Sequence, residues 1–161
     1  MLRYRLSLLI LIYLLLTSTV QAQDPMKDHK ITALKGLKDV ALVLRPNVKL
    51  EVLSHKEIVD TCELNLKQRI PELQVKANAQ SSNNWLEISY ITLSGGGFVE
   101  ISLYRSVIVI ATGEVVYAKV WDDKRLFLGQ YNRDNLRECL DTLLISFGAD
   151  FVRANRTGEK K

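Results

Sequence analysis

Apolar residues along this chain follow two kinds of repeat. In several short runs they are dense or alternate with polar residues, which predicts strands, and in two longer segments they recur every three or four positions, which predicts helices. Each predicted helix has one apolar face, and most of the strands alternate. The pattern therefore predicts an α+β fold, a two-layer sandwich in which a mainly antiparallel sheet carries two helices on one face, in the order β-α-β-β-β-β-α.

The first strand and the first helix have clear boundary signals. Residues 39–45 are rich in Val and Leu and end at Pro46, as expected of a short buried strand. Ser54 and Glu57 have the spacing of a capping box, which predicts a helix start, and Pro71 marks its end. The apolar stripe of this helix contains Ile58, Val59, Cys62, Leu66 and Ile70.

Four further strands are predicted to follow as a meander. A polar turn at residues 80–84 would join the first two as a hairpin, and the glycines of Ser94–Gly97 and of Thr112–Glu114 mark the other turns. Asp122 and Asp123 follow the last strand and are predicted to lie in a solvated loop. The four predicted strands cover residues 73–79, 85–93, 98–110 and 115–121.

The last predicted element is a long helix. Asn135 and Glu138 have the spacing of an N-terminal cap, and Gly148 lies inside the helix, where it is expected to loosen the last turns. The apolar stripe consists of Leu136, Leu140, Leu143, Phe147 and Phe151.

The first 22 residues have the organisation of a secretory signal peptide. Arg3 and Arg5 precede an apolar run, residues 8–16, and the site Val20-Gln21-Ala22 ends in a small residue. We therefore expect a signal peptide (1–22), a flexible segment (23–33), a single α+β domain (34–156) and a flexible tail (157–161). The mature protein would be periplasmic or secreted, and the alternative is that the leader is retained as an anchor.

Charge narrows the range of partners. Because Arg3 and Arg5 lie in the leader, which contains no acid, the 22 basic residues fall to 20 against 18 acidic ones, a net charge of +2. A balance this small gives little attraction for nucleic acid or for an anionic membrane. We expect no nucleic-acid partner, and no stable membrane span once the signal is removed.

No motif in the sequence points to catalysis. The two histidines, His29 and His55, lie far apart, and no pair of residues has zinc-ligand spacing. Ser94–Gly97 joins two strands and lacks the Lys of a phosphate-binding loop, and no nucleophile elbow occurs. We therefore predict no catalytic, cofactor-binding or metal-binding residue, no cofactor, and a protein that is not an enzyme.

Aromatic residues are concentrated on the predicted meander. Aromatic side chains favour strands because they pack well there, so these residues would usually belong to the core. If several of them emerged on the uncovered face of the sheet, they would form an exposed aromatic surface suited to binding. The candidates for that surface are Tyr90, Tyr104, Tyr117 and Trp121, with Trp85 nearby.

Cys62 and Cys139 lie on the two predicted helices. If the helices are neighbours, the two cysteines could form a disulfide in an oxidising compartment, provided that their Cα atoms are within about 7 Å. The alternative is two separate buried thiols, which the position of Cys139 at the margin of its stripe favours.

Several short sequence segments of the chain resemble those of a group of small exported bacterial proteins of unknown function. The similar segments are residues 37–43, 59–66, 70–75 and 147–155. In that group small hydroxyl residues precede the Trp of the last strand, whereas here Ala118, Lys119 and Val120 precede Trp121. The resemblance implies an exported α+β protein and identifies no catalytic residue.

These observations lead to one main hypothesis about function. The chain is expected to be an exported, non-catalytic binding or assembly module of the bacterial cell envelope, with an envelope protein as its partner. It would act through the open face of the sheet or through an edge strand. The alternative is a small secreted enzyme or a ligand carrier with no recognisable motif.

Overall fold

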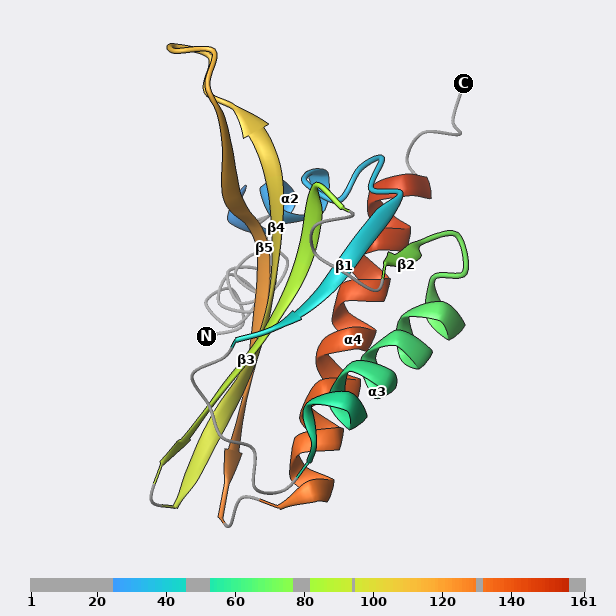
Figure 1. Cartoon of the computed structure of the whole chain (residues 1–161), viewed down its shortest axis with the longest axis vertical. Coiled ribbons are helices and arrows are strands. Elements are labelled where there is room, and N and C mark those ends of the chain that lie inside the picture. The colour runs from blue at the N-terminus through green and yellow to red at the C-terminus, as the bar shows by residue number, and fades with distance from the viewer. Residues whose placement is uncertain (1–24, 46–52, 77–81, 94, 130–131, 157–161) are drawn as a thin grey trace, which may run out of the picture.

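The computed structural model describes residues 25–45, 53–76, 82–93, 95–129 and 132–156, so the predicted signal peptide and the predicted tail lie outside the described residues. Within these ranges the chain forms helices and strands, and four of the strands follow one another between α3 and α4 (Figure 1). In chain order they are α2 (Pro25–Thr32), β1 (Asp39–Leu44), α3 (His55–Arg69), β2 (Gln74–Lys76), β3 (Asn84–Leu93), β4 (Gly96–Ile108), β5 (Val115–Leu128) and α4 (Arg133–Arg156).

The described strands form one mixed sheet in the order β2-β1-β3-β4-β5. β1 pairs in parallel with both β2 and β3, while β3–β4 and β4–β5 are antiparallel. The α+β class is confirmed. The prediction of a mainly antiparallel sheet holds for β3, β4 and β5 but not for β1 and β2, which make the sheet mixed, and the hairpin between the second and third strands is wrong. β1 takes the position between two parallel neighbours because its run of Val, Ala and Leu suits a strand that is buried by the sheet around it.

Helix α3 begins and ends as its local sequence predicts. The Ser54 hydroxyl accepts a hydrogen bond from the Glu57 N–H (3.2 Å), and the Ser54 N–H donates to the Glu57 carboxylate (2.9 Å), which confirms the capping box. Ile58, Cys62 and Leu66 are completely buried. The helix ends at Arg69, just before Pro71.

Helix α4 has the predicted stripe but a different start. Asn132 accepts a hydrogen bond from the Asn135 N–H (2.8 Å), so the cap lies three residues before the predicted one and Asn135 is inside the helix. Gly148 is buried where α4 faces the end of α3, with Arg69 and Ile70 as its nearest neighbours. Every residue of the predicted stripe is buried: Leu136, Leu140, Leu143, Phe147 and Phe151.

Two segments that were predicted to be irregular are regular. The lead-in at 23–33, predicted to be flexible, contains α2, whose Lys30 forms an ion pair with Asp122 (2.6 Å). β5 continues seven positions beyond Trp121 to Leu128, so Asp122 and Asp123 lie within a strand and not in a loop. Both differences arise from tertiary contacts: β5 is an edge strand, so its polar side chains stay near solvent while its backbone pairs with β4.

Helices α3 and α4 cover the same face of the sheet (Figure 1). α3 lies against β1 and β2, α4 lies against β4 and β5, and the two helices contact each other. One apolar core fills the space between the helices and the sheet. None of the helices in the described ranges combines the length and apolar character that a membrane crossing requires.

Candidate functional site

The four aromatic residues predicted to form an exposed surface do not share one face. Tyr90 and Trp121 are buried in the core, at 2% and 1% exposure, whereas Tyr104 is half-buried and Tyr117 is 55% exposed. Side chains alternate along a strand, and an extra residue in β5, opposite the step from Leu103 to Tyr104, shifts this alternation. The predicted surface is therefore wrong for Tyr90 and Trp121.

Trp121 is part of the core between β5 and α4. Its ring packs edge-on against Phe147, with ring centroids 5.1 Å apart. Its indole N–H donates to the carboxylate of Asp150 on α4 (3.2 Å), which satisfies a donor that would otherwise be buried without a partner. Trp121 therefore joins the helix layer to the edge of the sheet.

Trp85, Tyr104 and Tyr117 form an aromatic cluster. The Trp85 and Tyr104 rings stack at 5.2 Å with an interplanar angle of 9°, and Tyr117 tilts against Trp85 at 4.7 Å. Sequence reasoning named Trp85 only as a neighbour of the predicted surface. The register of β3 and β4, which pairs Trp85 with Tyr104, was the missing information.

The hairpin of β4 and β5 extends beyond the rest of the sheet. β3 begins at Asn84, which pairs with Arg105, and the Ser106 N–H donates to the carbonyl of Asn83 (3.2 Å). Beyond that point, among the described strands, only β4 and β5 pair with each other. We call residues 107–117 the arm, which projects from the body of the molecule (Figure 1).

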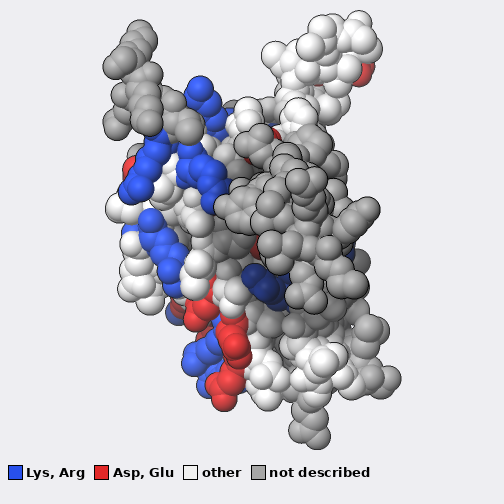
Figure 2. All heavy atoms as spheres, turned by 180° about the vertical axis from the view of Figure 1, so that it is seen from behind, with Lys and Arg blue, Asp and Glu red and all other residues white. Residues whose placement is uncertain are grey.

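The arm is apolar and exposed. Ile108, Ile110 and Val115 are 68%, 98% and 66% exposed, and Val116 and Tyr117 are also exposed. Glu114 is the only charged residue in the arm. Figure 2 shows the arm as a projection with almost no charged surface. Soluble proteins seldom leave such a surface uncovered, because an apolar hairpin with free edges promotes pairing with other chains.

The backbone of the arm is nevertheless well ordered by hydrogen bonds. The Val109 N–H donates to Glu114 (2.8 Å), and the Thr112 and Gly113 N–H groups both donate to the Val109 carbonyl. Gly113 has a φ of 72°, a conformation that glycine adopts without strain. The exposed side chains are thus held on a defined turn.

The base of the arm is fixed to the body of the protein. The Arg105 guanidinium donates to the carbonyl of Ala33 (2.6 Å) and to the Asn84 side chain (3.2 Å). Lys119 donates to Glu100 (3.0 Å). Burial opposes the ionisation of Glu100, but hydrogen bonds from Lys119 and Ser102, with the charge of Lys119, outweigh it and hold the pKa of Glu100 below its usual value.

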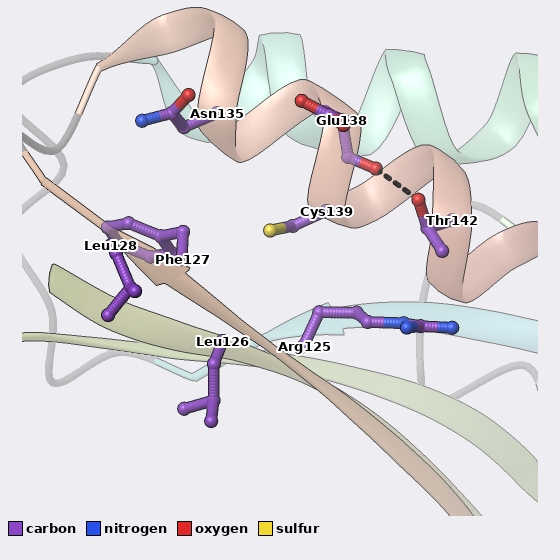
Figure 3. Close-up of a pocket in the computed structure, with 8 residues that line it drawn as sticks. All are labelled: Arg125, Leu126, Phe127, Leu128, Asn135, Glu138, Cys139 and Thr142. Carbon is purple, nitrogen blue, oxygen red and sulfur yellow. Dashed lines mark hydrogen bonds between the residues drawn. The ribbon is translucent and has the colours of Figure 1, made fainter.

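A hollow of about 330 Å³ lies at the other end of β5, between its last residues and α4 (Figure 3). Cys139 points from α4 toward β5, and Leu126 and Leu128 point away from α4. Burial, aided by Glu138 and opposed by Arg125, raises the pKa of Cys139, so its thiol is neutral near pH 7 and a weak nucleophile. The hollow is lined by Arg125, Leu126, Phe127, Leu128, Asn135, Glu138, Cys139 and Thr142.

The two cysteines are not bonded in this structure. Cys62 is completely buried in α3, where burial and the nearby Asp141 raise the pKa of its thiol to about 12. Cys139 is buried at the edge of the hollow. The structure thus has the two separate buried thiols that were the alternative to a disulfide.

The two histidines lie on different helices. His29 lies on α2 and His55 begins α3, and both are exposed. Among the described residues no group of three or more His, Cys, Asp or Glu side chains is arranged to hold a metal ion.

Comparisons with known proteins match this chain to solved structures at low sequence identity. No protein-family model and no curated protein matches the sequence. The PelC dodecamer from Paraburkholderia phytofirmans is a similar solved structure, with 13% identity over 70% of this chain and 87% of that chain and a TM-score of 0.35. A minor lipoprotein from Acinetobacter baumannii has 10% identity over 74% of this chain and 93% of that chain, with a TM-score of 0.33. TM-scores this low do not establish a shared fold.

Proposed function

We propose that this protein is an exported, non-catalytic binding or assembly module of the bacterial cell envelope, and that the arm is its docking surface. The observation that carries the proposal is the exposure of Ile108, Ile110 and Val115 on an ordered hairpin. The pattern of a signal peptide at residues 1–22 supports the compartment. An envelope protein is the expected partner.

The energetics favour a covered arm. Fully burying an isoleucine side chain stabilises a complex by about 1.5 to 3 kcal/mol. Ile108 and Ile110 contribute little of this to the isolated chain, because both are largely exposed. A partner that covers them would gain this energy without reorganising the arm, since the turn is already held by hydrogen bonds.

A shortened hairpin tests the proposal. Val107 and Val116 pair across the arm, so residues 108–115 can be replaced by Asn-Gly, a sequence suited to a two-residue hairpin turn. The core and the Arg105 contacts remain, so we expect the shortened protein to be exported and to unfold at a similar denaturant concentration. We expect it to lose its function in the envelope and its partner.

Photo-crosslinking in cells locates the contact. A photoreactive amino acid at Ile110 is expected to form a discrete adduct, and the same residue at Leu64, an exposed position on α3, serves as the control. Adducts at both positions or at neither would contradict the proposal.

The hollow next to Cys139 provides the test of the alternative function. Its volume is at the lower limit for small-molecule sites, about 300 to 1,000 Å³, so a ligand carrier would use this space. Native mass spectrometry of the exported protein would detect a retained small molecule. If Cys139→Trp abolished the retention of such a molecule and shortening the arm did not, the protein would be a ligand carrier. The docking proposal would then be overturned.

A further inference from the structure

Every second residue of β5 turns its backbone groups away from β4, toward the outer edge of the sheet. Within the chain, α2 contacts this strand, and the Lys124 N–H donates to the Asp123 carboxylate (2.8 Å). Backbone hydrogen bonds alternate along an antiparallel pair, and the Val109 N–H donates to the Glu114 carbonyl, so the backbone groups of these two residues face each other. Bonded positions repeat every two residues from Glu114. The backbone groups of Val115, Tyr117 and Lys119 fall between the bonded positions and therefore point outward. The Ser106 N–H, opposite Tyr117, turns away from β5 to Asn83, as this alternation requires.

The other half of β5 has the same property. The Gly129 N–H donates to Gly95, and alternation from this bond turns the backbone groups of Asp122, Lys124, Leu126 and Leu128 outward. The Asp122 carbonyl accepts a hydrogen bond from Lys30 of α2 (3.0 Å), which agrees with its outward direction and engages it within the chain.

The irregularity in β5 places these outward-facing residues on one face of the sheet. Tyr104 pairs with Lys119, but Leu103 pairs with Trp121, so one extra residue separates the two halves. The residues with outward backbone groups are odd-numbered in 115–119 and even-numbered in 122–128. Without the extra residue, the side chains of the two groups would lie on opposite faces of the sheet. With it, Val115, Tyr117 and Lys119 share the face of Asp122, Lys124 and Leu126.

This edge is complementary to itself. When a second β5 strand runs antiparallel with Val115 opposite Leu126, the next outward pairs are Tyr117 with Lys124 and Lys119 with Asp122. Each pair occurs twice, and no like charges face each other. A shift that sets Tyr117 opposite Leu126 would place Lys119 against Lys124 and Asp122 against Asp122, which is unfavourable.

We propose that the partner of this edge is a second copy of the chain, bound by antiparallel pairing of the two β5 strands with Val115 opposite Leu126 and Lys119 opposite Asp122. This inference rests on the proposed function. It names a second copy of the chain as the partner that binds the base of the arm and the adjoining edge of β5. Strand addition supplies backbone hydrogen bonds, and the alternate side chains supply specificity.

Three contacts within each chain must adapt to this arrangement. The Lys124 N–H would exchange the Asp123 carboxylate (2.8 Å) for the partner strand. Lys30 would release the Asp122 carbonyl to the partner and keep the carboxylate, to which its distance is the shorter, 2.6 Å. Lys119 would share its ammonium between Glu100 and the partner's carboxylate. The contacts of Lys119 and Lys124 are exposed, and that of Lys30 is partly buried.

A charge exchange tests the pairing. We expect the exported wild-type protein to sediment as a dimer that dissociates on dilution. Lys119→Glu alone, or Asp122→Lys alone, places like charges opposite each other twice and should weaken the dimer by about tenfold or more. The double variant should recover most of the affinity. Repulsion within one chain, from Glu100 or Lys30, would persist in the double variant. Lys119 and Asp122 also attract each other within one chain, so the free energy of unfolding of each dilute, monomeric variant is measured as well. Recovery of the dimer affinity without a matching recovery of monomer stability identifies a contact between chains.

Cysteine pairs determine the register. The double variant Val115→Cys with Leu126→Cys should form a disulfide-linked dimer under mild oxidation, whereas Tyr117→Cys with Leu126→Cys should form much less. The wild type, with its two buried thiols, is the control. Preferred linkage through residues 117 and 126 would overturn the proposed register.

The inference and the proposed function fail in different ways. A wild-type protein that is monomeric at every concentration, or a dimer unaffected by the charge exchange, overturns the pairing of β5 strands. Crosslinks from the tip residue Ile110 to another protein would then still support docking through the arm. Absence of Ile110 adducts together with an intact dimer would overturn the arm as the docking surface and leave the β5 pairing standing.

Discussion

The stripe of α4 and the arm are two apolar regions with opposite surroundings. Leu143 and Phe147 are covered by the sheet and by α3, so their side chains are completely buried. Ile108 and Ile110 are equally apolar, but the hairpin that carries them leaves the sheet and has only two strands. Apolar character alone therefore does not identify the core, because a side chain is buried only where another layer reaches it.

The largest expected difference between the two regions is in stability. Leu143→Ala leaves a cavity in the core and should lower the free energy of unfolding by about 2 to 5 kcal/mol. Ile110→Ala removes side-chain atoms that are already in water and should change it by less than about 0.5 kcal/mol. Chemical denaturation of the two variants measures both, and equal losses would mean that the arm is covered within the single chain.

A smaller effect is expected where the core meets the edge strand. Asp150→Ala removes the acceptor of the buried Trp121 indole N–H and should lower the free energy of unfolding by about 1 to 3 kcal/mol. Tryptophan fluorescence should report the change around Trp121. Asp150→Asn, which keeps an acceptor, is the matched control and should retain most of the stability.

The capping box of α3 has a moderate expected effect. Ser54→Ala removes the acceptor for the Glu57 N–H and should lower the free energy of unfolding by about 1 kcal/mol. Ser54→Asp keeps an acceptor and should be close to the wild type. A loss as large as that of Leu143→Ala would show that Ser54 has a further role.

The smallest expected effect concerns the thiols, because slow labelling of these groups leaves the protein folded. The pKa of Cys62 is raised to about 12 and that of Cys139 is also raised, so few thiolates form near pH 7. In the native protein, Cys139 beside the hollow should react with iodoacetamide before Cys62, and both rates should rise with pH. After unfolding without reductant, two reactive thiols are expected, and none would reveal a disulfide.

Local signals predicted the helices well and the sheet less well. The spacing of Ser54 with Glu57 and the stripe from Leu136 to Phe151 depend on neighbours along the chain, and both are confirmed. The pairing of β2 with β1, and not with β3, depends on residues far apart in sequence. The aromatic residues show the same limit: Trp121 and Tyr117 are both on β5, and only the irregularity of the strand places one in the core and the other outside.

The sequence by itself determined the α+β class, the two main helices, the buried stripe of α4 and the tight turn at Gly113, because these follow from periodicity and from short-range hydrogen bonding. Only the tertiary structure decided the mixed strand order, the helix at Pro25–Thr32 and the length of β5. It also decided that the apolar run around Ile108 and Ile110 projects from the molecule. The physical reason is that burial and strand pairing depend on which distant segments lie alongside a residue, and no local pattern contains that information.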